Sequence, residues 1–223
     1  MRQTLLSEGK TKSYIKYAIG EIALVVIGIL IALSINNWSA TNKSNHAKEV
    51  VISKIKDEIK NNSQELDKAN AINQKILRAF NEYSKIYSGT SSEVIASPRE
   101  IQILRKEYPS FFRAKDSIKL DTKKYRYTGE TFIELEIPDI TSIAWETTRT
   151  INIANEFEYD CLYDLENTYN LQARVKREID KATDALLKGE VEDLFKILRV
   201  MNQLESQLKI SYNEMLTRID DCK

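Results

Sequence analysis

The sequence predicts a mainly α-helical protein in which one N-terminal transmembrane helix is followed by an antiparallel helical bundle with room for a small β-hairpin. Three observations support this prediction. Residues 17–35 form an almost uninterrupted apolar run. The 223 residues include only six Gly and three Pro, so turn-forming residues are scarce. Farther along, two long stretches repeat apolar residues three and four apart, which is the spacing of one helix face.

The apolar run is long enough to cross a membrane. At about 1.5 Å per residue, the stretch from Tyr17 to Ile35 covers close to the roughly 30 Å hydrocarbon core of a bilayer. Tyr14 and Tyr17 stand at one end and Trp38 at the other, where amphipathic rings settle among lipid head groups. We therefore expect a cytoplasmic tail at 1–16, a transmembrane helix at 17–38, and Tyr14, Tyr17 and Trp38 at the membrane interfaces.

Two other interpretations of the run stay open. Ala32-Leu33-Ser34 has the small-x-small form of a signal-peptide cleavage site, although the run is longer than the roughly 7–15 apolar residues typical of a signal peptide. The core helix of a soluble protein is the other alternative, although the rest of the chain is too hydrophilic to surround such a helix.

The transmembrane helix also contains candidate packing positions. Glu21 lies one turn inside the N-terminal edge, where its carboxylate can reach head-group water or hydrogen-bond a partner helix. Gly28 and Ala32 are four residues apart and form a small-xxx-small pair, which lets a second helix approach closely. Glu21, Gly28 and Ala32 are therefore the positions expected to pack if the chain associates with itself.

Short motifs surround the anchor. They are Ser7-Glu8-Gly9-Lys10-Thr11, Lys16-Tyr17-Ala18-Ile19-Gly20-Glu21, the apolar residues 24–33, and Ile35-Asn36-Asn37-Trp38. Together, mainly over residues 7–38, they resemble the opening of a family of uncharacterised single-pass membrane proteins from Bacteroidota. Ala144-Trp145-Glu146-Thr147 and Tyr169-Asn170-Leu171-Gln172 are similar to the same family more loosely. The resemblance implies an uncleaved inner-membrane anchor, and it carries no activity.

A soluble helical domain is expected to follow at 48–223. Residues 39–47 are polar and predict a short juxtamembrane connector. A helix at about 48–87 is then indicated by a seam of mostly apolar positions: Ile52, Ile55, Ile59, Asn62, Leu66, Ala69, Asn73, Ile76, Phe80, Tyr83 and Tyr87. This spacing is typical of a coiled-coil face. Asn62 and Asn73 are either buried amides that fix register or solvated positions that face a gap. The helix is expected to end by Ser88-Gly89, before a polar loop.

The middle of the chain is expected to hold shorter elements. Ser97-Pro98-Arg99-Glu100 is a capping box with proline at the first helical position, and it predicts a helix at about 98–108. Residues 117–137 form a hairpin or a loop in this prediction: residues 132–137 alternate as a half-buried strand does, and 125–127 can pair with them across Thr128-Gly129. A helix is expected at about 140–150.

Two long helices are expected to complete the bundle. Asn155-Glu156-Phe157-Glu158 offers a capping box for a helix at about 155–187, which Gly189 then ends. A last helix at about 190–220 carries the seam Val191, Leu194, Leu198, Met201, Glu205, Leu208, Tyr212, Met215 and Ile219. Helices with such stripes must bury them against each other.

The chemistry-bearing residues form no catalytic, metal or nucleotide motif. Lys plus Arg and Asp plus Glu both number 33, so no positive excess is available to bind nucleic acid. Cys161 and Cys222 lie far apart in no metal-ligand spacing, and we expect two free or incidental thiols. His46 stands alone among polar neighbours and is expected to be solvated. We expect no metal and no cofactor.

The orientation of the anchor follows from the lysines that flank it. Lys10, Lys12 and Lys16 precede the span, against Lys43 and Lys48 after it. This slight bias predicts a cytoplasmic N-terminus and a periplasmic C-terminal domain in the bacterial inner membrane.

Three classes of function fit the sequence. An interaction or scaffolding module without a catalytic centre needs no special chemistry and is favoured, with membrane lipid, a protein partner or a second copy as expected partners. A ligand-sensing extracytoplasmic domain that signals through a partner is the alternative. The third class is an enzyme of unknown type that uses Glu134, Glu136, Asp139 or Glu146, although a solvated surface explains these carboxylates more simply.

Overall fold

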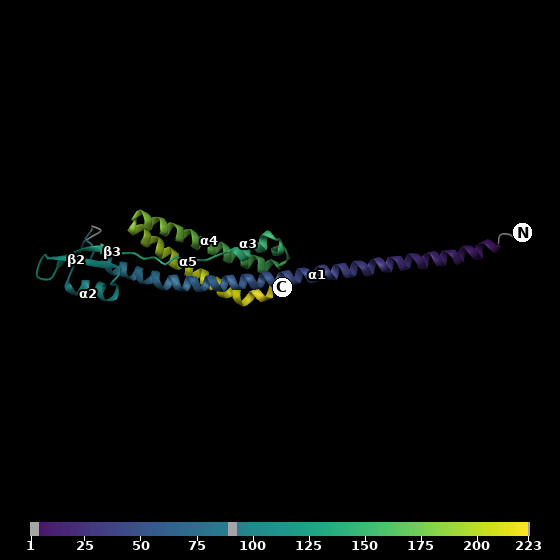
Figure 1. Cartoon of the computed structure of the whole chain (residues 1–223), viewed down its shortest axis with the longest axis horizontal. Helices are drawn as coiled ribbons and strands as arrows, with labels where there is room; N and C mark the ends of the chain where they lie inside the picture. Colours follow the sequence, from purple (N-terminus) through teal and green to yellow (C-terminus); the bar gives the residue numbers. More distant parts are fainter. Residues whose placement is uncertain (1–4, 89–92, 223) are drawn as a thin grey trace. The chain divides into compact units, whose positions relative to one another are not determined.

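The computed structural model describes the backbone of residues 5–88 and 93–222 and the side chains from residue 14 onward. Its elements are α1 (Leu5–Ser84), β1 (Glu93–Ala96), α2 (Pro98–Glu107), β2 (Phe112–Lys119), β3 (Tyr125–Thr131), α3 (Ile143–Thr150), η1 (Ile153–Glu156), α4 (Tyr159–Lys188), α5 (Val191–Arg218) and η2 (Ile219–Asp221) (Figure 1). The chain divides into two units, Met1–Val50 and Val51–Lys223. Helices predominate and one small antiparallel sheet accompanies them, which confirms the predicted fold class.

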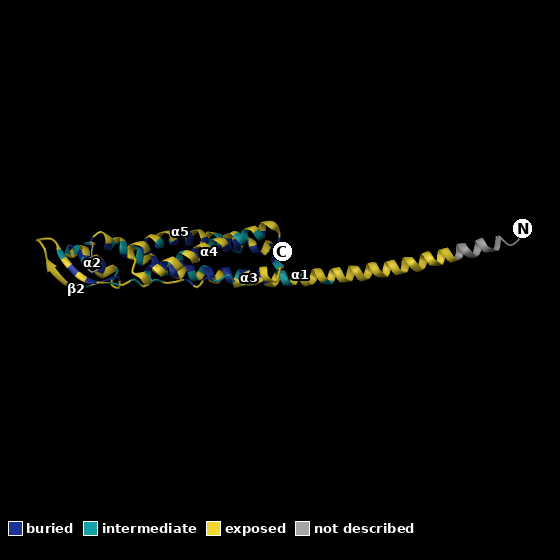
Figure 2. Ribbon diagram, turned by 90° about the horizontal axis from the view of Figure 1, so that it is seen from above, coloured by how far each residue is buried: buried dark blue, intermediate teal, exposed yellow. Residues whose placement is uncertain are grey.

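The first unit consists of the N-terminal part of α1 and contains the apolar run. The side chains of this run are exposed along its whole length (Figure 2). Among the described helices, α1 alone is long and apolar enough to cross a membrane. Because the side chains of the run are exposed and not buried, α1 does not act there as a core helix in the described structure. The transmembrane and signal-peptide interpretations both remain compatible with this finding.

Residues 39–47 are helical, so the predicted connector is wrong. α1 passes through them without a break. Ser, Thr and Asn in this stretch are weak helix formers, but each costs only about 0.5 kcal/mol, and the stretch contains neither Gly nor Pro. The polar composition therefore reports solvent exposure and not the loss of the helix.

Three helices of the second unit bury their seams against each other. Contacts from α1 to α5 and to η2, which follows it, run in opposite directions along the chain: Lys56 to Asp220 of η2, and Asp67 to Lys209 and Phe80 to Phe195 of α5. Contacts between α1 and α4 run in the same direction: Glu58 to Tyr169 and Asn62 to Gln172. α1 is thus antiparallel to α5 and parallel to α4, which requires the chain to return along the bundle before α4 begins.

Both predicted seams are buried over most of their length. The seam positions from Leu194 to Ile219, in α5 and η2, are buried, as are the α1 seam positions from Ile52 to Asn73, whereas Ile76 and Phe80 are half-buried. Val191 and Tyr87, at the ends of the two seams, are exposed. α1 ends at Ser84 rather than at about 87, because Tyr87 instead forms an isolated antiparallel bridge with Val94.

The sheet has the strand order β1-β3-β2, and the predicted hairpin partners are wrong. β3 pairs antiparallel with β2 on one side and with β1 on the other. The turn lies between β2 and β3, where the Asp121 carboxylate accepts hydrogen bonds from the backbone N–H groups of Lys123 and Lys124, both at 2.7 Å. These bonds hold the pKa of Asp121 below its usual value.

Gly129 lies inside β3 and not in a turn. A Cβ at this position would lie 2.4 Å from the carbonyl oxygen of Arg113 and 2.9 Å from Cα of Ala114. Both atoms belong to the backbone of β2, next to the irregular register between Ala114 and Asp116. Glycine therefore permits the close approach of the two strands.

Helix α2 begins with the predicted capping box. The Ser97 hydroxyl accepts from the Glu100 N–H at 3.3 Å, and the Glu100 carboxylate accepts from the Ser97 N–H at 2.7 Å. The second bond lowers the pKa of Glu100.

Residues 132–142, here termed the strap, run back along α1 from the sheet to α3. The Asn73 side chain donates to the Glu136 carbonyl at 2.9 Å and accepts from the Glu136 N–H at 3.0 Å. Asn62 makes the same pair with Thr141, at 2.7 and 2.9 Å. The eleven-residue step from Asn62 to Asn73 along the helix and the five-residue step from Glu136 to Thr141 along the extended strap both span about 16 Å. The spacing of the two amides therefore matches the spacing of their backbone partners.

The strap explains why residues 132–137 alternate without forming a strand. Ile133 and Leu135 are half-buried, whereas Glu134 and Glu136 are exposed. One face of an extended segment therefore packs inward, but its backbone partners are asparagine side chains. Both seam asparagines are buried, which excludes the solvated alternative, and they fix the place of the strap rather than the register of two helices.

The remaining boundaries differ in detail. α3 confirms the helix expected near 140–150, and α4 begins at Tyr159 rather than at about 155. The predicted cap fails because η1 occupies Ile153–Glu156, and the N-cap of α4 is Glu158, without a side-chain bond. The stop at Gly189 is confirmed: its φ is 72°, a left-handed conformation that favours glycine.

Cys161 and Cys222 form a disulfide, so the expectation of free thiols is wrong. Their Cα atoms are 5.5 Å apart, in the usual range for such a bond. The α4–α5 hairpin brings the start of α4 next to η2 at the end of the chain. Because the pairing depends on that hairpin, the spacing of the two residues in the sequence does not reveal it.

Candidate functional site

A cavity of about 710 Å³ opens where the sheet meets the C-terminal end of α1 and the first turns of α5. Its lining is largely aromatic and includes Phe80, Tyr83, Tyr87, Phe111 and Phe195. The Phe80 and Phe195 rings are stacked with centroids 3.5 Å apart, and Tyr83 meets Phe111 edge-on at 5.7 Å. Small-molecule sites are typically clefts of roughly 300–1,000 Å³ lined by apolar and aromatic groups. The cavity has the size and the lining of such a site.

Helix geometry explains why these side chains share one cavity. On α5, Glu192, Phe195, Lys196 and Arg199 follow the spacing i, i+3, i+4, i+7, which places them on one stripe of the helix. Phe80, Tyr83 and Ser84 form the matching stripe on α1, and β3 contributes Gly129 to Thr131 as a wall. An aromatic floor is therefore combined with a charged rim.

The Tyr83 hydroxyl belongs to the wall of the cavity. Burial raises the pKa of Tyr83, and its hydrogen bond with Thr131 opposes that shift. The hydroxyl therefore stays protonated at neutral pH and keeps its ability to donate a hydrogen bond.

The charges on the rim differ in their partners. Glu130 pairs with Lys115, outside the cavity. Lys196 pairs with Asp193 at 2.7 Å, and this contact raises its pKa, to which Glu192 also contributes. Arg199 has no carboxylate within ion-pair distance among the side chains that the structure describes, and it donates a hydrogen bond to the Asn81 amide oxygen at 3.4 Å.

A second group of polar side chains lies deep between α1, α4 and α5. The Glu58 carboxylate accepts hydrogen bonds from the Tyr169 hydroxyl at 2.7 Å and from the Ala144 N–H at 2.8 Å. The latter N–H belongs to the first turn of α3, where a carboxylate is favoured by the helix dipole. Burial, followed by the bond to Glu58, raises the pKa of Tyr169. This group anchors α3 and the strap to the bundle.

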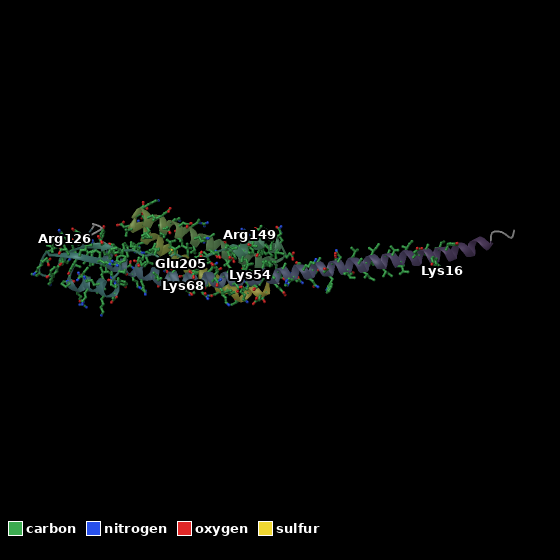
Figure 3. The ribbon with its side chains drawn as sticks, viewed as in Figure 1. Lys16, Lys54, Lys68, Arg126, Arg149 and Glu205 are labelled. Carbon is green, nitrogen blue, oxygen red and sulfur yellow. A yellow bond between two sulfur atoms is a disulfide. The ribbon has the colours of Figure 1, made fainter. Side chains whose placement is uncertain are left out.

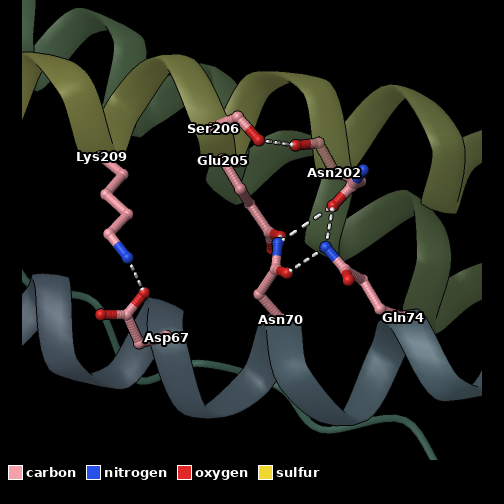
Figure 4. A network of polar contacts seen from close by, with 7 residues as sticks. All are labelled: Asp67, Asn70, Gln74, Asn202, Glu205, Ser206 and Lys209. Atoms are coloured by element: carbon pink, nitrogen blue, oxygen red, sulfur yellow. Dashed lines mark hydrogen bonds and ion pairs between the residues drawn. The ribbon is translucent and has the colours of Figure 1, made fainter.

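Glu205 forms a third polar group, with α1 residues (Figures 3 and 4). One carboxylate oxygen accepts from the Asn70 amide at 2.9 Å, while the buried Oε1 has no hydrogen-bond partner. Asn70 also donates to Asn202 at 3.0 Å, and Gln74 donates to Asn70 at 2.7 Å. Burial raises the pKa of Glu205, against the effect of the Asn70 bond. The seam thus contains a carboxyl group that gains stability by holding a proton.

The predicted membrane residues all lie on the first unit. Tyr14, Tyr17, Glu21, Gly28, Ala32 and Trp38 are exposed on α1, and a Cβ added to Gly28 would meet nothing within 4 Å. The surface that a second helix would need is therefore open. Their roles at the bilayer and in helix packing stay predictions.

The carboxylates considered for catalysis lie apart from the cavity. Glu134, Glu136, Asp139 and Glu146 are exposed, as is His46. Within the described part of the chain, no three His, Cys, Asp or Glu residues come together as a metal site would need.

The sequence indicated only some of the residues that line the cavity. Phe80 and Tyr83 are seam positions of α1, but a seam residue that lines a cavity has the same spacing as one in a closed core. Phe111 and Phe195 were not predicted as site residues. The aromatic pair at 111–112 is a signal that could have indicated Phe111, whereas the sequence around Phe195 contains no such cluster.

Comparison with known proteins gives one match. A family model described as a family of unknown function (DUF6090) matches residues 21–95. That range begins inside the apolar run and ends in β1. No curated protein and no solved structure matches the chain.

Proposed function

We propose that this chain is a single-pass inner-membrane protein whose periplasmic domain binds a small molecule with an apolar body in the aromatic cavity. The cavity is the observation that carries the proposal, because its volume and lining suit a small ligand. We also propose that the chain belongs with the single-pass Bacteroidota proteins that its N-terminal motifs resemble. The match over residues 21–95 supports that relationship.

The disulfide supports the periplasmic location. Disulfides persist in oxidising compartments and are rare in the cytosol. Cys161 and Cys222 both lie in the second unit, on the C-terminal side of the apolar run. The lysine bias before the run points to the same orientation.

Cysteine labelling tests this orientation. The native cysteines are paired, so a single added cysteine supplies the reporter. Thr122 is exposed in the β2–β3 turn, and Thr122→Cys should react with a membrane-impermeant maleimide in intact spheroplasts. Ser7→Cys, in the N-terminal tail, should react only after lysis, and the wild-type chain serves as the blank. Labelling of Ser7→Cys alone in intact cells would reverse the proposed orientation.

A photoreactive alkyl probe tests the binding site. The full chain is reconstituted in lipid nanodiscs and irradiated with a diazirine-bearing dodecanol, and the modified peptides are identified by mass spectrometry. Crosslinks are expected on peptides that contain 80–87 or 191–199. Val191 lines the cavity, so Val191→Trp should remove these crosslinks by filling it. Val200→Trp is the matched control, because Val200 is exposed on the same helix outside the cavity.

A protein-binding scaffold is the second candidate function. The exposed apolar side chains Leu187, Val200 and Ile210 on α4 and α5 favour it. In that case Val200→Asp or Ile210→Asp should change which proteins are recovered after crosslinking in native membranes, while the cavity variant Val191→Trp should not.

A further inference from the structure

We infer that the ligand of the aromatic cavity carries an anionic head group and that Arg199 is the residue that selects it. This inference rests on the proposed function and adds the chemical class of the ligand. It is carried by the unequal compensation of the charges around the rim, combined with their position over an apolar floor.

The two acidic side chains of the rim are both stabilised by positive charge from the protein itself. Glu130 pairs with Lys115. Glu192 lies in the first turn of α5, where the helix dipole favours a negative charge, and four residues before Lys196, the favourable order for a helical pair. A cationic ligand would therefore compete with Lys115 for Glu130 and with the helix dipole and the charge of Lys196 for Glu192.

The two basic side chains of the rim are not equivalent. Lys196 has Asp193 within 2.7 Å and Glu192 in its electrostatic field. Arg199 lies one turn farther along α5, beside the same cavity, and its described polar contact is the neutral amide of Asn81. A guanidinium can bind a carboxylate or phosphate through two parallel hydrogen bonds. Arg199 is therefore the one basic side chain of the rim for which the described chain supplies no carboxylate within ion-pair distance.

The placement of Arg199 fits an amphiphile. Phe195 lies one turn before it and forms part of the aromatic floor, where the ring stacks on Phe80. An alkyl or aromatic body on this floor brings its polar end toward Arg199 in the third turn of α5. The ligand class is thus a molecule with an apolar body of moderate size and one carboxylate, sulfonate or phosphate at its end.

The test uses three photoreactive probes that share one alkyl chain. Diazirine-bearing dodecanoic acid, dodecanol and dodecylamine are compared at the cavity peptides of the full chain in nanodiscs. The acid is expected to reach half-maximal crosslinking at a concentration about tenfold below that of the alcohol, which corresponds to about 1.4 kcal/mol. The amine is expected to crosslink least.

Arg199 variants then assign the selectivity. Arg199→Gln should raise the concentration for half-maximal crosslinking by the acid to that of the alcohol, while the value for the alcohol stays the same. Arg199→Lys should restore part of the preference for the acid. Arg78→Gln is the control, since Arg78 is exposed on α1 and does not line the cavity.

The outcomes separate the two proposals. Crosslinking by none of the probes at the cavity defeats the proposed function. Equal crosslinking by acid and alcohol in the wild-type chain, preference for the amine, or an acid preference that survives Arg199→Gln defeats the inference on the head group and leaves the proposed function standing.

Discussion

Removal of the Cys161–Cys222 disulfide should lower the stability of the second unit by about 4 kcal/mol. The bond closes a loop with a sequence separation of 61, and the loop-closure entropy that it removes from the unfolded chain grows with the logarithm of that length. At 25 °C this gives about 4 kcal/mol. With a urea dependence of about 2 kcal/mol per molar, the unfolding midpoint should fall by about 2 M.

The assay needs a signal from the second unit alone. Trp145 is 2% exposed and stacks on Tyr169 with ring centroids 5.6 Å apart, so its fluorescence reports the packing of α3 on the bundle. The chain contains one other tryptophan, Trp38, and Trp38→Phe removes its background. Urea titrations of this chain in nanodiscs are compared with and without reductant, and with Cys161→Ser/Cys222→Ser.

The double serine variant is the control, because reductant should leave its unfolding midpoint unchanged. The reasoning fails if reductant leaves the midpoint of the disulfide-competent chain unchanged, or if the protein purified from its native compartment yields two free thiols on denaturation.

Three further substitutions test particular contacts by thermal or urea unfolding. The pKa of Glu205 is raised above its ordinary value of 4.5. The stabilising contribution of its protonated form is therefore complete below that pH and is lost as the pH rises through the folded-state pKa. Glu205→Gln should be more stable than the wild-type chain at pH 8, with a smaller advantage near pH 5. Asn73→Ala should cost roughly 1–3 kcal/mol, because the Glu136 backbone loses both partners, and an unchanged midpoint would contradict this role. Gly129→Ala should cost about 1–3 kcal/mol, because the new Cβ meets the Arg113 backbone; full stability would show that β2 can shift.

The helices could be predicted because their burial repeats along the sequence. From Leu194 to Ile219, each turn of α5 places one side chain in the same interface, so the apolar spacing directly reports the packing. The capping box at Ser97 and the helix end at Gly189 could be predicted as well, because each depends only on neighbouring residues in the sequence.

The strap and the disulfide were missed because their partners are distant in the sequence. The alternation in residues 132–137 does report a one-sided extended segment, but it says nothing of what pairs with the backbone. Its partner is the Asn73 side chain, 63 residues away. Cys161 and Cys222 become neighbours only after α4 and α5 have folded back on each other. The cavity was missed for the same reason, since its walls come from α1, β3 and α5, which are distant in the sequence.

The disulfide and the turn at Gly189 close the α4–α5 pair at its two ends. From Cys161 to Cys222 the chain forms a covalent ring, with the sharp turn beside the cavity and the sulfur bridge at the opposite end. A closed ring of two packed helices cannot easily spread apart like an open hairpin. Any widening of the cavity must therefore come from its other walls, α1 and β3. Of these two, α1 is the helix that also contains the apolar run of residues 17–35.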